Sequence, residues 1–344
     1  MNRDEAREIK AQLADYVDEL VQRQGVPPLA LDGGVVPGPT LGLGLAPRGD
    51  GGYTVAVRYR LGLPAVRRLA RKVIEQAGPA VDVRRTGRIR PVTTEHLVSP
   101  EGSDRRIGHR PPVATALAVG QTDRVRPLRP GVSIAHVDVT AGTLGAFVRV
   151  DGVLHALSNY HVLVGSPQGQ IGDVVVQPGP ADGGHAPQDR VGTLAASVPL
   201  EHGRNATVDA AVAVLDDPTV DLDYPVGRIT STTVAFGGED VAKIGRTTAL
   251  TVGRVTAIEL DDVVVGYGGG LGNLRFDDQI EVESTGEGPF SRGGDSGSLV
   301  YRADGVAIGL LFAGSETGGD NGTGLTYLNP IDAVLGALGA ELAR

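Results

Sequence analysis

The first 24 residues show the periodicity of a helix with one apolar face. From Asn2 to Gln24, apolar residues recur at intervals of three and four, which predicts an amphipathic helix. Asn2 and Glu5 can form a capping box, and Gly25 ends the pattern. The apolar stripe must be buried, either against its own domain or in a homo-oligomer formed through this region; it comprises Ile9, Leu13, Tyr16, Val17, Leu20 and Val21.

Residues 51–92 predict a small strand–helix–strand module, because alternating segments flank one segment of helical spacing. The preceding stretch, 26–52, is rich in Pro and Gly, and we expect it to be irregular. We therefore expect residues 1–92 to form an amino-terminal helix plus a small α/β module. Its predicted elements are a strand over Tyr53–Arg60, a helix over Pro64–Ala77 that stops at Gly78, and a strand over Val81–Arg90.

Residues 93–130 show little periodicity and continue a basic stretch. Ten arginines lie between Arg84 and Arg129, which raises the question of a nucleic-acid-binding arm. No aromatic side chains interleave with these arginines to stack on bases, so we expect a solvated linker and no nucleic-acid partner.

After Gly131 the pattern is almost purely that of β-strands. Two alternating segments, 144–150 and 153–157, flank Asp151-Gly152, which predicts a tight hairpin. Short strands that follow one another without helices indicate a sandwich or barrel rather than a doubly wound sheet. Asn329-Pro330 then begins a closing helix that we expect to run through Leu342. The remaining strand candidates are 174–177, 190–198, 208–215, 251–260, 279–283, 298–301, 307–312 and 324–328.

Composition narrows the functional classes. The chain has 344 residues, enough for two domains, and its net charge of −9 argues against general affinity for nucleic acid. There is no Cys, so thiolate metal sites are excluded and a nucleophile, if present, must be a serine. The first residues lack the apolar run of a secretory signal, and no apolar stretch reaches membrane-spanning length. We expect a cytoplasmic protein that has no membrane partner.

Three short segments carry the candidate chemistry, and their order matters more than any one of them. They present a histidine, then an aspartate, then a serine between glycines, which is the chain order of a chymotrypsin-type catalytic triad. Taken together, they predict an acyl-transfer site made of His161, Asp209 and Ser296. The segments are Ser158-Asn159-Tyr160-His161-Val162, Val208-Asp209-Ala210-Ala211-Val212 and Gly294-Asp295-Ser296-Gly297-Ser298.

The residue types fit that chemistry. A serine hydroxyl is a poor nucleophile at neutral pH, so it needs a base such as His161 within hydrogen-bond reach. Asp209 would hold the imidazole in one tautomer and stabilise the imidazolium. Gly294 and Gly297 permit a tight turn that aims the amides of Gly294 and Ser296 at a developing oxyanion.

Each residue alone also has an ordinary structural interpretation. A Gly-Asp-Ser-Gly run is usually a polar turn, a single histidine often ends a strand, and Asp216, Asp217 and Asp221 compete with Asp209. An α/β-hydrolase is excluded, because its histidine follows the nucleophile whereas the last histidine here is His202. The Gly-rich segments 42–44 and 268–270 lack the context of a nucleotide site, so we expect no cofactor and no metal.

On these residues, the region 131–344 resembles the trypsin-like (chymotrypsin-fold) serine proteases. Leu157–Val162 is similar to the histidine segment of bacterial members. Gly245–Val255 is similar to a strand pair of the α-lytic protease and streptogrisin group, with Ala249 where those enzymes carry Gly. Gly309–Gly314 is similar to the substrate-binding strand, with Phe312 where Ser is usual. Gln177–Gly184 more particularly resembles the plant narrow-leaf type of trypsin-like protease and its bacterial relatives.

The resemblance implies a mainly β fold of two six-stranded antiparallel β-barrels with a carboxy-terminal helix. It also implies an intracellular, oligomeric protein. In this arrangement the chain divides into residues 1–92, a linker over residues 93–130 and a protease domain over residues 131–344.

The resemblance also assigns further site residues. Lys243 falls where the α-lytic protease group has a basic residue that pairs with the acid beside the nucleophile, which implies a Lys243–Asp295 ion pair. By position, the substrate pocket has an apolar base and favours an uncharged, apolar residue before the scissile bond. The residues implied for this pocket are Phe290 at its base, with Phe312, Gly314 and Gly324 around it.

Three functional hypotheses stand. The first is a serine endopeptidase that cleaves protein or peptide substrates through an acyl-enzyme. The second is a protease-fold binding or scaffold protein with weak or lost catalysis, suggested by Phe312 and Ala249. The third is a latent protease whose arm, residues 26–130, blocks the cleft until it is cut or displaced.

Overall fold

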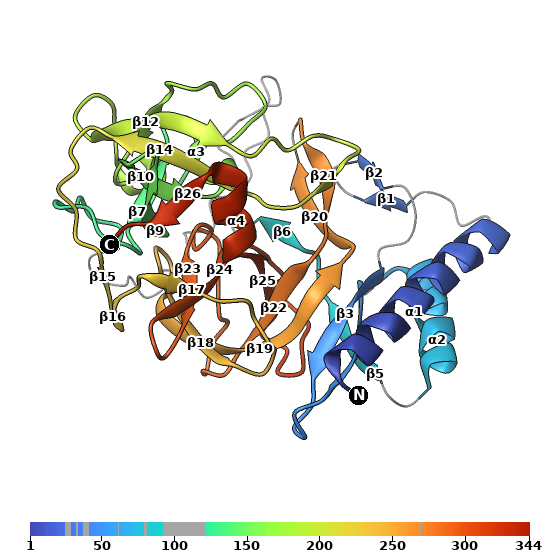
Figure 1. The fold of residues 1–344 in the computed structure, drawn as a ribbon. Coiled ribbons are helices and arrows are strands. Elements are labelled where there is room, and N and C mark those ends of the chain that lie inside the picture. Colours follow the sequence, from blue (N-terminus) through green and yellow to red (C-terminus); the bar gives the residue numbers. More distant parts are fainter. Residues whose placement is uncertain are drawn as a thin grey trace.

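The computed structural model describes residues 1–24, 29–31, 34–36, 41–60, 62–78, 81–91, 121–268 and 270–344. Most of the predicted linker, residues 93–120, therefore lies outside the described residues. The described chain is mainly β, with a closed barrel, a half-barrel and a small α/β module that lies beside the closed barrel (Figure 1). No helix in these ranges is long and apolar enough to cross a membrane.

Six strands form the closed barrel in the carboxy-terminal half of the chain. Their order is β18-β23-β24-β25-β22-β19, and β18 also pairs with β19, which closes the ring. The interior holds apolar side chains such as Val255, Val282 and Ile308. The strands are β18 (Asp240–Gly245), β19 (Ala249–Asp261), β22 (Gln279–Ser284), β23 (Leu299–Arg302), β24 (Val306–Gly314) and β25 (Leu325–Pro330).

The preceding half forms an open sheet of the order β26-β9-β10-β14-β12-β11-β7-β8. Asp151 and Gly152 have positive φ values of 50° and 80° in the predicted tight turn between β9 and β10. Closed barrel and half-barrel together confirm the predicted mainly β, chymotrypsin-like fold class. The strands are β7 (Ser133–His136), β8 (Gly142–Thr143), β9 (Ala146–Val150), β10 (Val153–Ser158), β11 (Val174–Val176), β12 (Arg190–Ser197), β14 (Ala211–Leu215) and β26 (Ala340–Leu342).

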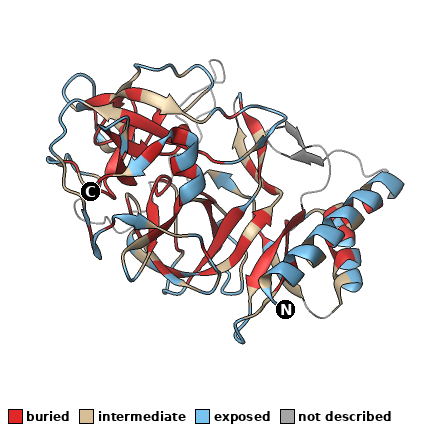
Figure 2. Cartoon of the chain, in the orientation of Figure 1, coloured by how far each residue is buried: buried red, intermediate tan, exposed pale blue. Residues whose placement is uncertain are grey.

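The amino-terminal module is a βαβ unit covered by the first helix. The parallel strands β4 (Tyr53–Arg60) and β5 (Val81–Thr86) are joined by α2 (Pro64–Ala77), as predicted. The apolar stripe of α1 (Arg3–Gln24) packs against this unit, while the outer side of the helix is exposed (Figure 2). The chain itself thus covers the stripe; self-association stays a prediction.

Two sequence-based expectations were wrong, both because distant strands decide the local structure. Residues 41–47, expected to be irregular, form β3 (Leu41–Pro47), which pairs with β4 and with β19. A Cβ on Gly44 would lie 2.9 Å from the carbonyl oxygen of Ile258, so glycine permits this close approach. The closing helix, α4 (Ile331–Leu338), ends at Gly339 in a left-handed conformation, and the chain then returns as β26 against β9.

Short elements complete the structure near the junction of the two halves. A hairpin of β20 (Val263–Gly268) and β21 (Gly272–Phe276) is inserted between β19 and β22, and β6 (Arg90–Pro91) pairs with β24. Side chains of the hairpin share a hydrophobic cluster with residues of both halves. The other short elements are β1 (Leu29–Leu31), β2 (Gly34–Val36), α3 (Tyr160–Leu163), η1 (Pro180–Asp182), β13 (Asn205–Ala206), β15 (Asp223–Tyr224), β16 (Gly227–Arg228) and β17 (Ser231–Thr232).

Candidate active site

His161 and Asp209 form a buried pair between β10 and β14. His161 Nδ1 lies 2.5 Å from Asp209 Oδ2, and the His161 backbone N–H donates to Asp209 Oδ1 at 3.3 Å. The aspartate is fully buried and the histidine is 5 % exposed. Because a carboxylate only accepts, Nδ1 carries the proton and Nε2 presents its lone pair. The pair therefore has the tautomer that a general base requires.

Three buried amide side chains fix the backbone on which Asp209 sits. Asn159 Nδ2 donates to the Asp209 carbonyl oxygen at 2.7 Å, and the Asp209 N–H donates to Asn329 Oδ1 at 2.9 Å. Asn329 Nδ2 in turn donates to Gln279 Oε1 at 2.7 Å. These residues come from three distant segments, so no local pattern identified their role.

Tyr267 of β20 is a further neighbour that the sequence did not single out. Its hydroxyl donates to Asp209 Oδ2 at 2.5 Å, and its ring meets the His161 ring edge-on with centroids 5.8 Å apart. Burial, reinforced by the charge of Asp209, raises the pKa of Tyr267 well above its usual value. The hydroxyl therefore acts as a neutral donor to the carboxylate.

Ser296 lies in the turn between β22 and β23, next to the histidine segment. The Thr143 N–H donates to the Ser296 carbonyl oxygen at 2.8 Å, and Ser158 Oγ donates to the Thr143 carbonyl oxygen at 2.7 Å. Ser296 itself is fully buried, and its hydroxyl donates to the Phe312 carbonyl oxygen at 3.3 Å. Within the described ranges, buried His161 Nε2 has no hydrogen-bond partner. The Ser296 hydroxyl and His161 Nε2 are thus not hydrogen bonded to each other here.

The turn around Ser296 has the backbone that the glycines were expected to permit. Gly294 and Gly297 have φ values of 98° and 93°. A Cβ on Gly294 would lie 2.4 Å from both Arg246 Nη1 and Thr247 Oγ1, so glycine is required for space as well. In the part of the chain that the structure describes, the amides of Gly294 and Ser296 have no acceptor. Two free amide donors in one turn can bind an anion.

The carboxylate of Asp295 is fully buried and well supplied with donors. Its oxygens accept the N–H groups of Thr247, Thr248 and Arg292 and the Thr248 hydroxyl, at 2.7–3.1 Å. Lys243 Nζ lies 3.4 Å from Asp295 Oδ2 and is likewise fully buried. Burial lowers the pKa of Lys243, while the charge of Asp295 opposes this shift.

Arg246 links two segments that carried the resemblance. Its guanidinium binds both carboxylate oxygens of Asp182 at 2.6 Å, and its backbone N–H donates to Thr143 Oγ1 at 3.0 Å. The Thr143 hydroxyl then donates to the Gly294 carbonyl oxygen at 2.8 Å. This chain of contacts supports the glycine turn from the half-barrel side.

The residues expected around a substrate pocket lie in different surroundings. Phe290 packs in the core of the closed barrel, and the Phe312 ring packs 4.7 Å from the ring of Phe276. Gly314 ends β24 opposite Arg90, and Gly324 has a φ of 96°. Both phenylalanine side chains thus belong to hydrophobic clusters, and their role in a pocket stays a prediction.

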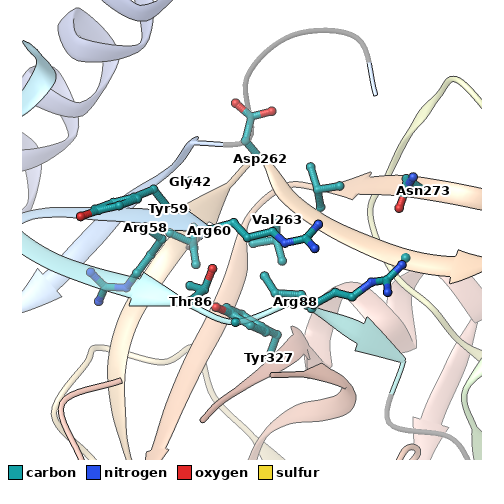
Figure 3. A pocket seen from close by; sticks show the side chains of 15 residues that line it. Gly42, Arg58, Tyr59, Arg60, Thr86, Arg88, Asp262, Val263, Asn273 and Tyr327 are labelled. Atoms are coloured by element: carbon teal, nitrogen blue, oxygen red, sulfur yellow. The ribbon is translucent and has the colours of Figure 1, made fainter. Parts of the chain in front are cut away.

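Two cavities lie near these elements. One of about 520 Å³ adjoins His161 and Tyr267 and is also lined by His136, Asp173 and Pro91; its volume is typical of sites for small ligands or side chains. The other, of about 40 Å³, lies between the module and the hairpin, where the side chains of Arg58, Arg60 and Arg88 extend (Figure 3). Only the larger cavity has room for part of a substrate at the candidate site.

In the comparison with known proteins, the chain is similar only to solved structures. No family model and no curated protein matches the chain. Thermobifida fusca protease A is 21% identical over 63% of this chain and 98% of its own, with a TM-score of 0.44. Cellulomonas bogoriensis chymotrypsin is 23% identical over 63% of this chain and 98% of its own, with a TM-score of 0.42. Nocardiopsis protease is 20% identical over 63% of this chain and 99% of its own, with a TM-score of 0.44. These structural neighbours are bacterial serine proteases of the trypsin/chymotrypsin type.

Proposed function

We propose that the protein is a serine endopeptidase that cleaves protein or peptide substrates with His161, Asp209 and Ser296. The observation that carries this proposal is the buried 2.5 Å contact between His161 Nδ1 and Asp209 Oδ2. It leaves Nε2 buried and without a partner among the described residues. The glycine turn that carries Ser296 is joined to the histidine segment through Thr143, which contacts both Ser296 and Ser158. A buried nitrogen without a partner is costly, and the Ser296 hydroxyl is the donor suited to satisfy it.

The proposed reaction proceeds in two steps. Ser296 Oγ attacks the substrate carbonyl carbon while its proton passes to His161 Nε2, and the amides of Gly294 and Ser296 stabilise the oxyanion. The proton then passes to the leaving amine as the peptide C–N bond breaks, which leaves an acyl-enzyme. Water, deprotonated by the same nitrogen, attacks the ester, and the Ser296 hydroxyl is regenerated as the acid product leaves.

Active-site labelling tests this proposal directly. A fluorophosphonate probe should label the wild type, and the purified protein should cleave a casein substrate. Ser296→Ala should lose both activities, whereas Ser291→Ala, a nearby change of the same kind, should keep them. Equal labelling of wild type and Ser296→Ala would refute the proposal.

A latent form of this protease is favoured by one further observation. The segment that leads into the undescribed stretch pairs antiparallel with β24, placing Pro91 opposite Ala313 and Arg90 opposite Gly314. The pairing continues where Gly87 N–H donates to the Thr317 carbonyl oxygen at 2.9 Å. Because β24 resembles a substrate-binding strand, this segment occupies the edge that an extended substrate would use. The full burial of Ser296 agrees with such a closed state.

A glycine substitution tests the latent form in the full-length chain. A Cβ on Gly87 would lie 2.5 Å from Thr317 Oγ1, so Gly87→Val should displace the segment and accelerate labelling. Gly49→Val is the matched control, because a Cβ there meets no atom within 4 Å. A folded Gly87→Val protein that labels no faster than the wild type would contradict latency through this segment. Absence of labelling in every variant would instead favour the scaffold hypothesis.

A further inference from the structure

The carboxylate of Asp209 is fully buried, and it depends on few donors. In the described ranges, the side chains within hydrogen-bond distance of its oxygens are those of His161 and Tyr267, both on Oδ2 at 2.5 Å. The His161 backbone N–H contributes a weaker contact to Oδ1 at 3.3 Å. A buried carboxylate is stable only when donors compensate for lost water. Tyr267 is therefore one of the two described side chains that compensate for the burial of this carboxylate and hold it in place.

We propose that Tyr267 is a positioning residue of the triad. Its hydroxyl holds the Asp209 carboxylate, and its ring holds the His161 imidazole. This inference rests on the proposed function of His161, Asp209 and Ser296. It assigns to the β20–β21 hairpin a part in catalysis that the sequence pattern did not assign.

The hairpin also reaches the serine side of the site. The Tyr267 ring stacks on Phe276 with centroids 6.0 Å apart, and Phe276 packs 4.7 Å from Phe312. The Phe312 carbonyl oxygen accepts the Ser296 hydroxyl. A row of three aromatic rings therefore connects Tyr267 with Phe312, the residue whose carbonyl oxygen accepts the Ser296 hydroxyl. The hairpin thus contacts Asp209 directly and reaches Ser296 through β24.

The electrostatic surroundings make this donor hydroxyl well suited to its role. Burial and the charge of Asp209 keep Tyr267 protonated, so it donates throughout the neutral range. Across the cavity, the titratable groups that line the same space as His161 are His136, whose Nε2 lies 3.1 Å from the Asp173 carboxylate, Asp173 itself and Asp138. The charge of Asp209 also acts on Tyr160, but the hydroxyl of Tyr160 donates to the Ser166 carbonyl oxygen. Among the described residues, the side chains hydrogen bonded to the Asp209 carboxylate are therefore those of His161 and Tyr267.

Tyr267→Phe tests the proposal, because it removes the hydroxyl and keeps the ring. We expect fluorophosphonate labelling of Ser296 to become about tenfold slower, which corresponds to about 1.4 kcal/mol. We also expect the pH of half-maximal labelling to rise, because a carboxylate with one donor fewer binds the protonated imidazole more strongly. Tyr53→Phe is the matched control: its hydroxyl likewise donates to a carbonyl oxygen, that of Phe236 at 2.7 Å, and its removal should change neither quantity.

A second readout separates this inference from the proposed function. The Nδ1 proton of His161 should give a resolved low-field NMR signal, assigned by its loss in His161→Ala, and Tyr267→Phe should shift it even in a protein that does not label. Failure of the wild type to label would reject the proposed function while the signal still reports on Tyr267. An unchanged NMR signal would overturn the positioning role of Tyr267. So would an unchanged labelling rate and pH profile in a Tyr267→Phe protein that still labels, or an equal effect of Tyr53→Phe.

Discussion

Replacing Lys243 by Met tests whether a buried charge pair maintains the turn that carries Ser296. Lys243 and Asp295 are both fully buried, with Nζ and Oδ2 3.4 Å apart. Removal of one partner of such a pair typically costs 3–5 kcal/mol, because the other charge stays buried without compensation. Asp295 keeps its contacts from Thr247, Thr248 and Arg292, so we expect about 3 kcal/mol, at the lower end of that range.

Two measurements follow this change. Thermal unfolding should move down by about 4 °C, as scaled from the unfolding entropy per residue. Fluorophosphonate labelling should fall by about 10²-fold, because a turn without its anchor misplaces an oxyanion donor. Lys72→Met on the exposed side of α2 is the control for charge loss alone. The double variant Lys243→Met/Asp295→Asn should recover part of the lost stability, since no charge is left unpaired.

The pH dependence of stability gives a third measurement on the same variant. Burial lowers the pKa of Lys243 below the value of 10.5 that it has in an unfolded chain. Between these two pKa values the unfolded chain binds more protons than the folded one, so stability rises with pH across this window. Lys243→Met should lack this rise. If the variant retained wild-type labelling, melting temperature and pH dependence, the pair would have no role in the turn.

Two further predictions concern other buried groups. Burial raises the pKa of Tyr301 from 10.0 to about 12, so the unfolded chain loses this proton first and the free energy of unfolding falls as the pH rises from 10 to about 12. In urea unfolding, Tyr301→Phe should flatten this alkaline decline, and an unchanged decline would contradict the prediction. Because the hydroxyl has no partner among the described residues, the variant should also be more stable than the wild type by about 1 kcal/mol at pH 8. Asp182→Asn should slow labelling about tenfold, because Arg246 loses the bidentate partner that supports the glycine turn. The exposed Asp216→Asn should have no such effect, and an equal loss in both variants would refute the role of Asp182.

The sequence predicted those parts of the structure that local chemistry determines. The helix over 64–77 and the strand over 53–60 have the predicted bounds, because a periodic pattern and a terminal glycine are both local signals. The strand over 41–47 escaped prediction because its alternate glycines lower strand propensity, and its stability comes from pairing with β19. The division of the chain at residues 92 and 130 stays a prediction.

The same distinction explains which site residues could be identified. His161, Asp209 and Ser296 stand in segments whose residue types and order are informative by themselves. Tyr267 and Asn329 carry no local signal, because each acquires its role only when a distant segment folds against Asp209. The support of a buried carboxylate is a property of the tertiary structure, so a single sequence does not reveal it.

The elements that we propose to carry out catalysis differ from the strand that we propose to control access to it. The proposed triad, its glycine turn and the positioning residue Tyr267 come from the barrel strands, their connections and the β20–β21 hairpin, whereas β6 lies along the edge of β24. β5 precedes β6 in the chain and is held in the large sheet through β4, β3 and β19, whereas β6 pairs at the edge of β24. Displacement of β6 therefore need not disturb the barrel interior. Activity and latency are therefore separable by substitution: changes in the turn should abolish labelling, while changes at Gly87 should only alter its rate.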